Sequence, residues 1–160
     1  MKDLNLGISK QDLSGVVAIL NKLHADEFTL YVKTRNYHWN VTGAHFYDLH
    51  KFFESQYETL DEIIDEVAER VRSLGGVSLG SMSEFIKLTR IKEQPGQFLQ
   101  AQTMIQNLLE NHEAIVRFLR EDVETCANKH KDAGTSDFLT GLMEQHEKTA
   151  WMLRATLKDE

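Results

Sequence analysis

Residues 44–74, with the sequence AHFYDLHKFFESQYETLDEIIDEVAERVRSL, decide the fold because they carry one unbroken helical pattern. Their apolar side chains recur every three, four or seven positions, at Phe46, Leu49, Phe53, Leu60, Ile64, Val67 and Val71. That spacing is typical of an amphipathic helix with one buried face. Gly75 and Gly76 follow directly and predict the end of the helix. At 1.5 Å per residue the helix would be about 45 Å long, so we expect a protein built from long helices.

The sequence on both sides of this segment predicts three more helices. Apolar residues at helical spacing follow a start signal at Ser9 and Asp12, and others follow Pro95, which suits a first helical turn. The expected helices cover residues 9–37, 44–74, 95–127 and 134 to near the C-terminus. Between the second and third helices, a crossover of about 20 residues carries a short apolar piece at 82–88, which predicts a small extra helix. No strand pattern occurs, so we predict an all-α, ferritin-like four-helix bundle with a long crossover.

The length and composition favour one domain. The 160 residues are 41% hydrophobic and 27% charged, which is enough to bury a core without disulfides. We expect a single domain over residues 1–160, with 1–8 as a short flexible N-terminus. The lone Cys126 cannot form an internal disulfide and is expected to be packed, which fits a reducing compartment. No signal sequence and no run of about 18 apolar residues occurs, so we expect a cytoplasmic protein without a membrane segment.

A second pattern on residues 44–74 consists of side chains that bind metals. On a wheel of 100° per residue, a sector of roughly 100° beside the apolar face contains His50, Glu54, Asp65 and Glu69. His50 and Asp65 are fifteen positions apart, which is about 22 Å along a helix, so they cannot bind one ion within a chain. If a second copy packs antiparallel across a two-fold axis, the His50 end of one helix meets the Asp65 end of the other, and two identical sites form.

The ligand types in this sector favour iron(II). Imidazole and carboxylate ligands with open coordination positions suit an ion that must react with an oxidant, whereas a closed zinc site would favour cysteine. The alternative is a solvated acidic face, because the same helix also carries Glu58, Asp61, Glu62 and Glu66. A conventional ferritin centre inside one bundle would need Glu-x-x-His pairs. The sequence has none, so that class of site is disfavoured.

Several motifs resemble the signature of the Dps family. Residues 36–43 read NYHWNVTG, with His50 twelve positions after His38, and residues 65–70 read DEVAER. The similarity continues through the glycine pair at 75–76, DFLT at 137–140 and HEKTAWMLR at 146–154, so it covers nearly the whole chain. This resemblance implies a four-helix subunit of a dodecameric shell. In such a shell, hydrogen peroxide oxidises iron(II) at dimer interfaces and ferric mineral is deposited inside.

The resemblance also implies roles for individual residues. His38, His50 and Glu54 would come from one chain as catalytic iron ligands. Asp65 and Glu69 would come from the partner chain. Some family members carry Asp at the position of Glu54, and the longer side chain here leaves terminal and bridging coordination both open.

Three further residues receive roles from the same resemblance. Trp39, next to His38, has two interpretations of equal weight: an indole that donates electrons at the site, or an interface packing residue. Asp132 and Asp137 match the region where the family has acidic three-fold channels that admit iron(II), and a ring of carboxylates would concentrate cations. The alternative for Asp137 is that it caps the last helix together with the two residues before it.

The remaining histidines have no predicted iron role. His24, His112 and His146 fall on or near apolar helix faces, so we expect hydrogen-bonded core residues. His45 and His130 have no assigned role.

DNA binding is the main alternative function, because the family takes its name from DNA protection. That activity commonly depends on a mobile lysine-rich tail. The first fifteen residues carry two lysines against two aspartates, at Lys2, Lys10, Asp3 and Asp12. The chain ends in Leu-Lys-Asp-Glu, and its net charge is -7. An acidic chain without a basic arm repels phosphates, so we expect no direct DNA binding. A third alternative, a purely structural bundle, would not need the two site histidines.

Overall fold

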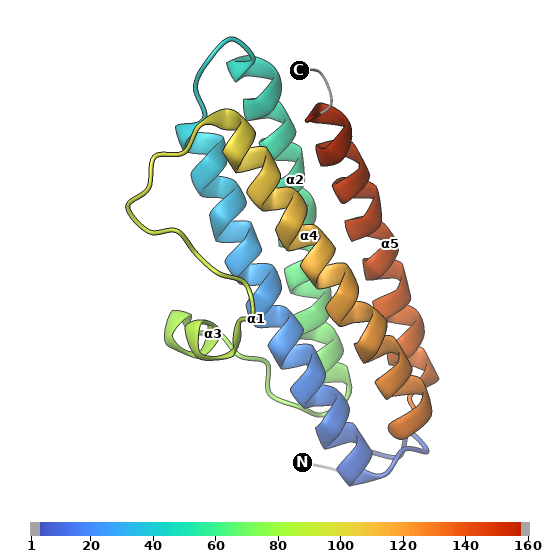
Figure 1. Ribbon diagram of the computed structural model, residues 1–160. Helices are drawn as coiled ribbons and strands as arrows, with labels where there is room; N and C mark the ends of the chain where they lie inside the picture. Colours follow the sequence, from blue (N-terminus) through green and yellow to red (C-terminus); the bar gives the residue numbers. More distant parts are fainter. Residues whose placement is uncertain (1–3, 158–160) are drawn as a thin grey trace.

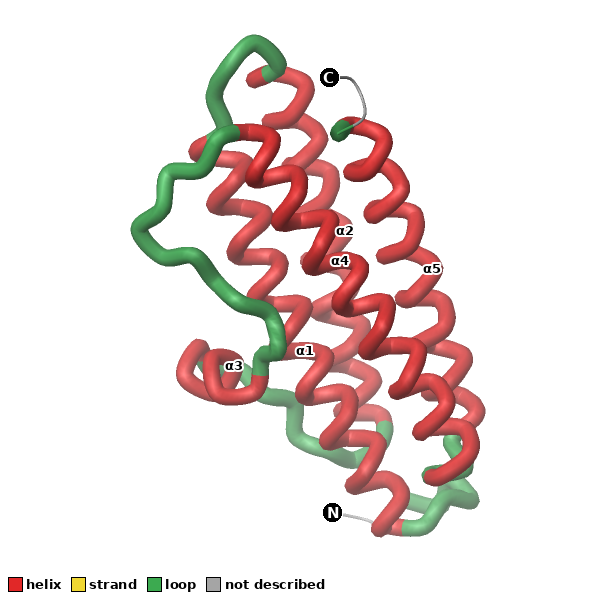
Figure 2. Tube along the Cα trace, in the orientation of Figure 1, coloured by secondary structure: helices red, strands yellow, loops and turns green. Residues whose placement is uncertain are grey.

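Four long helices run side by side in the computed structural model, which describes residues 4–157 (Figure 1). They are α1 (Lys10–Asn40), α2 (Phe46–Ser73), α4 (Ala101–Glu124) and α5 (Ala133–Thr156). The short α3 (Met82–Leu88) lies beside α1, within the crossover between α2 and α4. Residues 4–157 contain no strand (Figure 2). The predicted all-α, ferritin-like four-helix bundle with an extra crossover helix is confirmed.

Helix α1 begins where its capping residues predict. The Ser9 hydroxyl accepts a hydrogen bond from the Asp12 backbone N–H (3.1 Å) and donates one to the Asp12 carboxylate (2.6 Å). Of the predicted flexible segment 1–8, residues 1–3 lie outside the described part, and Ile8 packs against the core. The helix runs to Asn40, beyond the predicted end at Tyr37. This extension keeps residues 38 and 39 helical.

The crossover is tied to the bundle by polar contacts. The Asp26 carboxylate of α1 accepts hydrogen bonds from the backbone N–H (2.5 Å) and the Nε (2.8 Å) of Arg90. The Lys33 ammonium donates to the Lys92 carbonyl (2.6 Å) and to Asn111 of α4 (2.7 Å). One acceptor of Lys33 lies in the crossover and the other in α4, so this buried side chain of α1 joins the three segments.

Helix α4 begins at Ala101, so the assignment of Pro95 to its first turn is wrong. Gly96 follows the proline with a φ of +74°, a left-handed conformation that ends any helix and favours glycine. The Gln97 N–H donates to the Gln94 carbonyl (3.4 Å) across this turn. Proline at the second position and glycine at the third is a sequence signature of a type II turn. The proline therefore serves the crossover and not the helix.

A π-helical turn, Thr125–Lys129, follows α4 and redirects the chain. The side chain of His130, the next residue, lies against α1, and Lys131 takes a φ of +56°. The His130 Nδ1 lies 3.2 Å from the Asp12 carboxylate. Its ring covers Gly15, where an added Cβ would lie 2.3 Å from the ring Cε1. The absence of a side chain at Gly15 therefore permits this close approach.

A continuous apolar core fills the space between the four long helices. Helix α1 packs along α2, and α4 packs along α5, whereas the seam between α2 and α5 is more open. Cys126 is a fully buried free thiol, which confirms that it is packed. Burial raises the pKa of this thiol to about 12, so thiolate chemistry is suppressed.

Candidate metal centre

His38 and His50 lie against each other where α1 ends and α2 begins. Their rings stack with centroids 3.8 Å apart and an interplanar angle of 21°. The Nδ1 of His38 lies 2.8 Å from the His50 carbonyl oxygen, and the Nδ1 of His50 lies 2.9 Å from the His38 carbonyl oxygen. A carbonyl oxygen can only accept, so each Nδ1 is the donor and carries the proton. In the neutral ring each Nε2 then has a free lone pair, which is the tautomer that a metal ligand needs.

Aromatic neighbours hold this histidine pair in place. Tyr57 contacts the His38 ring edge to face, with centroids 5.2 Å apart, and Phe46 lies 5.1 Å from the His50 ring. His38 is buried and His50 is partly exposed. The pair is thus fixed on one side and open on the other. Tyr57 could have been found in the sequence, because it lies seven positions after His50 on the same helix face.

Glu54 lies one helical turn after His50, with its side chain 28% exposed. Its carboxylate accepts a hydrogen bond from the Lys51 ammonium (2.5 Å). This hydrogen bond lowers the pKa of Glu54, and the positive charge of Lys51 acts in the same direction. An ionised carboxylate is a ligand type that suits a cation, as a neutral imidazole is. Lys51 was missed by sequence reasoning, although its spacing of three residues from Glu54 is a recognisable helical ion pair.

Asp65 and Glu69 lie farther along α2 and are exposed. Asp65 borders a shallow surface hollow of about 380 Å³ together with Asp61, Glu62 and Ile64. The fold does not bring either carboxylate to the histidine pair. Within residues 4–157 of one chain, no group of three or more His, Cys, Asp or Glu side chains is placed to hold a metal ion. The five predicted ligands therefore do not form one metal site within a single chain.

Trp39 lies on the surface beside this site and is 64% exposed. The Arg35 guanidinium lies 5.4 Å from the Trp39 ring centroid and 4.5 Å from that of Tyr57. Arg35 also donates a hydrogen bond to the Tyr31 hydroxyl (2.8 Å). Trp39 is thus a neighbour of the histidine pair, in a position compatible with either predicted role.

The two channel candidates occupy different environments. Asp132 is buried at 2% exposure and caps α5, where it accepts hydrogen bonds from the Thr135 N–H (2.9 Å) and hydroxyl (2.6 Å). Arg70 lies 3.4 Å from the same carboxylate. This interior position argues against the prediction that Asp132 lines a channel, because its oxygens are already engaged. Asp137 is exposed, and the capping residue is Asp132. The channel role of Asp137 stays a prediction.

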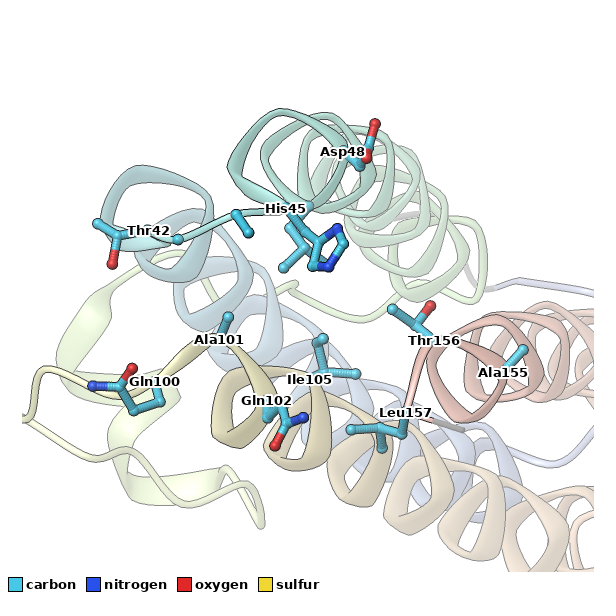
Figure 3. Close-up of a pocket in the computed structure, with 13 residues that line it drawn as sticks. Thr42, His45, Asp48, Gln100, Ala101, Gln102, Ile105, Ala155, Thr156 and Leu157 are labelled. Carbon is cyan, nitrogen blue, oxygen red and sulfur yellow. The ribbon is translucent and has the colours of Figure 1, made fainter. Parts of the chain in front are cut away.

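The remaining histidines lie away from the histidine pair of the site. His24 packs against Phe85, with ring centroids 5.1 Å apart. His112 and His146 hydrogen bond to each other in the bundle interior (2.8 Å). His45 projects into a pocket of about 860 Å³ at the end of the bundle, between the starts of α2 and α4 and the end of α5 (Figure 3). Asp48 also lines that pocket, and among its lining residues these two are the only His, Cys, Asp or Glu side chains, so no set of three ligands converges there.

Proteins of similar sequence match nearly the whole length of this chain. The Ferritin family model, described as a ferritin-like domain, matches residues 17–160. An uncharacterized low temperature-induced protein of Nostoc sp. is 45% identical over 160 residues, which cover 100% of this chain and 89% of the relative. DNA protection during starvation protein 2 of Bacillus anthracis is 37% identical over 143 residues, which cover 89% and 96%. Within residues 4–157, no helix has the length and apolarity that crossing a membrane would require.

Solved structures show the same fold. Dps from Thermosynechococcus elongatus has a TM-score of 0.88 at 31% identity, with 94% of each chain covered. The DPS protein of Vibrio cholerae O1 has a TM-score of 0.91 at 32% identity, with 99% of this chain and 98% of that chain covered. The Vibrio protein is described as a member of a superfamily of ferritin-like diiron-carboxylate proteins. The present chain therefore belongs to the Dps family of ferritin-like proteins.

Proposed function

We propose that the chain is a ferroxidase subunit that oxidises iron(II), preferentially with hydrogen peroxide, at sites shared by two copies. The product would be a ferric mineral stored in a hollow dodecameric shell, which would protect the cell from oxidative damage. The observation that carries this proposal is the histidine pair. The two Nε2 lone pairs, and the ionised Glu54 one helical turn after His50, would supply half of an iron site, and iron(II) accepts such a mixed ligand set.

The second half of the site would come from the partner chain. Asp65 lies about 22 Å from His50 along α2, and both carboxylates of its set are exposed and unable to reach His50 in their own chain. Two chains related by a two-fold axis, with their α2 helices antiparallel, would place each acidic set opposite the other chain's histidine pair. Each dimer would then contain two equivalent sites with ligands from both chains.

The chemistry follows from this ligand set. Iron(II) enters as the substrate, and the carboxylates of the two chains offset its charge. Two iron(II) ions each transfer one electron to peroxide, its O–O bond breaks, and both oxygens leave at the oxidation level of water. Because peroxide is consumed by two electrons at one dimer interface, release of hydroxyl radical is avoided. Exposed Asp137 near the start of α5 would help to concentrate iron(II) at the shell entrance.

Mixing of two variants tests the shared site. His50→Ala and Asp65→Ala should each slow peroxide-driven oxidation strongly, because each removes one ligand from every site. Both shells should still assemble, since neither side chain belongs to the core. After subunit exchange, each mixed dimer contains one site without either ligand and one site with all of them. Random exchange therefore restores about a quarter of the sites, and activity should return in that proportion.

The control is Glu58→Ala, which removes an exposed carboxylate of α2 outside the ligand set and should oxidise iron(II) at the unaltered rate. Mass spectrometry would establish that exchange occurred. Exchanged mixtures that remain as inactive as both parents would show that the two positions do not serve one site across two chains.

Direct DNA binding is the second candidate function, because curated relatives carry the name DNA protection during starvation protein. Twelve chains at a net charge of -7 each would carry -84, which opposes binding to phosphates. We propose protection through removal of iron and peroxide instead. Supercoiled plasmid should migrate unchanged with excess metal-free shell, and salt-sensitive retention would favour the DNA-binding function.

A further inference from the structure

The bundle interior contains three polar side chains, joined in a row by hydrogen bonds, that the proposed iron site does not use. Glu27 of α1, His146 of α5 and His112 of α4 are all at most 4% exposed. The His146 Nε2 lies 3.0 Å from the Glu27 carboxylate, and the His146 Nδ1 lies 2.8 Å from the His112 Nδ1. Among residues 4–157, His146 is the only hydrogen-bond or ion-pair partner of the Glu27 carboxylate. The middle histidine thus links a buried carboxylate to a second buried imidazole.

The number of protons on Glu27, His146 and His112 decides whether their charges balance. If each imidazole carries one proton, the two hydrogen bonds form but Glu27 remains an uncompensated anion inside the protein. Burying such a charge is strongly unfavourable. One additional proton makes His146 an imidazolium that donates from Nε2 to Glu27 and from Nδ1 to His112. The three side chains together are then neutral. His112 then keeps its single proton on Nε2.

We propose that Glu27, His146 and His112 form a proton-binding site in the bundle interior, which holds one proton more than two neutral imidazoles and a free carboxylate. The surroundings support this assignment, because they supply no other cation to Glu27. The neighbouring Asp26 is neutralised by Arg90, 2.6 Å away. His24 is the other titratable neighbour on α1, and burial lowers its pKa. Burial also lowers the pKa of His112 well below 6.5, so His112 stays neutral.

A polar route connects this site to the surface through the open seam between α2 and α5. The Nε2 of His112 and both amide atoms of Gln56 have no hydrogen-bond partner among the described residues. Beside them lies a space of about 10 Å³ lined by Gln56, His112 and His146, which is close to the smallest volume that holds one water. The uncharged Thr59 borders both this space and a wider groove of about 230 Å³, with Lys148 at the groove. One water bridging His112 and Gln56 would let the proton exchange with solvent.

The proton-binding site gives the fold a response to alkaline conditions. The folded protein holds a proton that an unfolded histidine releases as the pH rises through about 6.5. The stability that this proton supplies is therefore fully present below about pH 6.5 and is lost as the pH rises toward the value at which the folded site gives the proton up. This response belongs to the bundle interior and requires no iron.

Neutron diffraction from deuterium-exchanged crystals of the assembled protein, grown near neutral pH, tests the proposal directly. We expect three exchangeable deuterons on the side chains of the proton-binding site, two on His146 and one on His112 Nε2. We also expect a water between His112 and Gln56. A single deuteron on each ring with a bare Glu27 carboxylate would overturn the proposal. A metal ion bound to these side chains would overturn it as well.

A pair of matched variants gives an independent measurement. In Glu27→Gln a neutral amide oxygen accepts from a neutral His146, so the extra proton is no longer required. The control Glu147→Gln removes an exposed carboxylate on the residue after His146, which pairs with Arg120. Above neutral pH, the wild type and the control should lose stability with an additional dependence of up to one proton per chain, about tenfold in the unfolding equilibrium per pH unit. An equal pH dependence in Glu27→Gln would contradict the proposal, and a failure of that variant to fold leaves the neutron measurement to decide.

Discussion

Replacement of Gly15 by alanine measures how closely the chain after the π-helical turn packs onto α1. Alanine is better than glycine inside a helix by about 1 kcal/mol. At this position, however, the new Cβ would lie 2.3 Å from Cε1, 2.7 Å from Nε2 and 2.9 Å from Nδ1 of His130. The ring is buried and would have to leave its place. Overpacking of this kind typically costs about 1–3 kcal/mol.

We therefore expect Gly15→Ala to lower the free energy of unfolding by up to about 2 kcal/mol after the helix gain is subtracted. For a chain of this size that is a fall of up to about 8 °C in the unfolding midpoint, measurable by calorimetry at fixed protein concentration. Gly141→Ala is the matched control, because it also lies inside a helix but has nothing within 4 Å of its Cβ position. That control should be stabilised by about 1 kcal/mol.

A double variant completes the test. With His130 also changed to alanine, the Gly15→Ala substitution should no longer be destabilising, because the ring that it meets is gone. If Gly15→Ala alone proved as stable as Gly141→Ala, the close contact between His130 and α1 would not exist in solution. The rate of iron oxidation should be unaffected in all of these variants, since Gly15 lies at the opposite end of α1 from His38.

Four further predictions concern buried groups and the channel. Because burial raises the pKa of Cys126 to about 12, the thiol of the native protein should not react with a maleimide at mildly alkaline pH, and rapid labelling without unfolding would contradict its burial. Burial lowers the pKa of His112 well below 6.5, so at acidic pH His112 binds a proton in the unfolded chain but not in the folded one. The unfolding midpoint should therefore fall as the pH drops below about 6.5, and His112→Gln should weaken that fall. Asp132→Ala removes the α5 cap and the partner of Arg70, so it should lose about 1–2 kcal/mol of stability. Asp137→Ala should leave the unfolding midpoint in place and slow iron uptake; unchanged uptake would remove Asp137 from the entry route.

The helices were predictable where periodicity and capping agree. Ser9 and its partner Asp12 marked the start of α1, and the apolar piece at 82–88 became α3. Pro95 misled the prediction because proline suits both a first helical turn and a tight turn. The positive φ of Gly96 decides between them. The π-helical turn was not predicted, and the His130 that follows it packs against Gly15, a contact between residues far apart in the sequence.

The site residues were predictable by type and spacing, but their local chemistry was not. Sequence reasoning selected His38, His50 and Glu54. The fold stacks the rings of His38 and His50, and Glu54 follows His50 by one helical turn with its carboxylate bonded to Lys51. The tautomers of the two histidines depend on the path of the backbone between α1 and α2, which no residue pattern encodes. The capping role of Asp132 was missed for a similar reason, because an Asp before a helix and an Asp lining a channel look alike in sequence.

The hydrogen bonds that orient the two site histidines end on main-chain oxygens, and no substitution can delete a main-chain oxygen. In His38→Ala the carbonyl of residue 38 still receives the His50 Nδ1–H, and the reverse holds for His50→Ala. Losing one imidazole therefore leaves the other preorganised, so the site should degrade in steps under mutation. What it cannot tolerate is a change in the length of the connection at residues 41–45. One inserted residue there would shift both carbonyls out of reach and misalign both ligands at once.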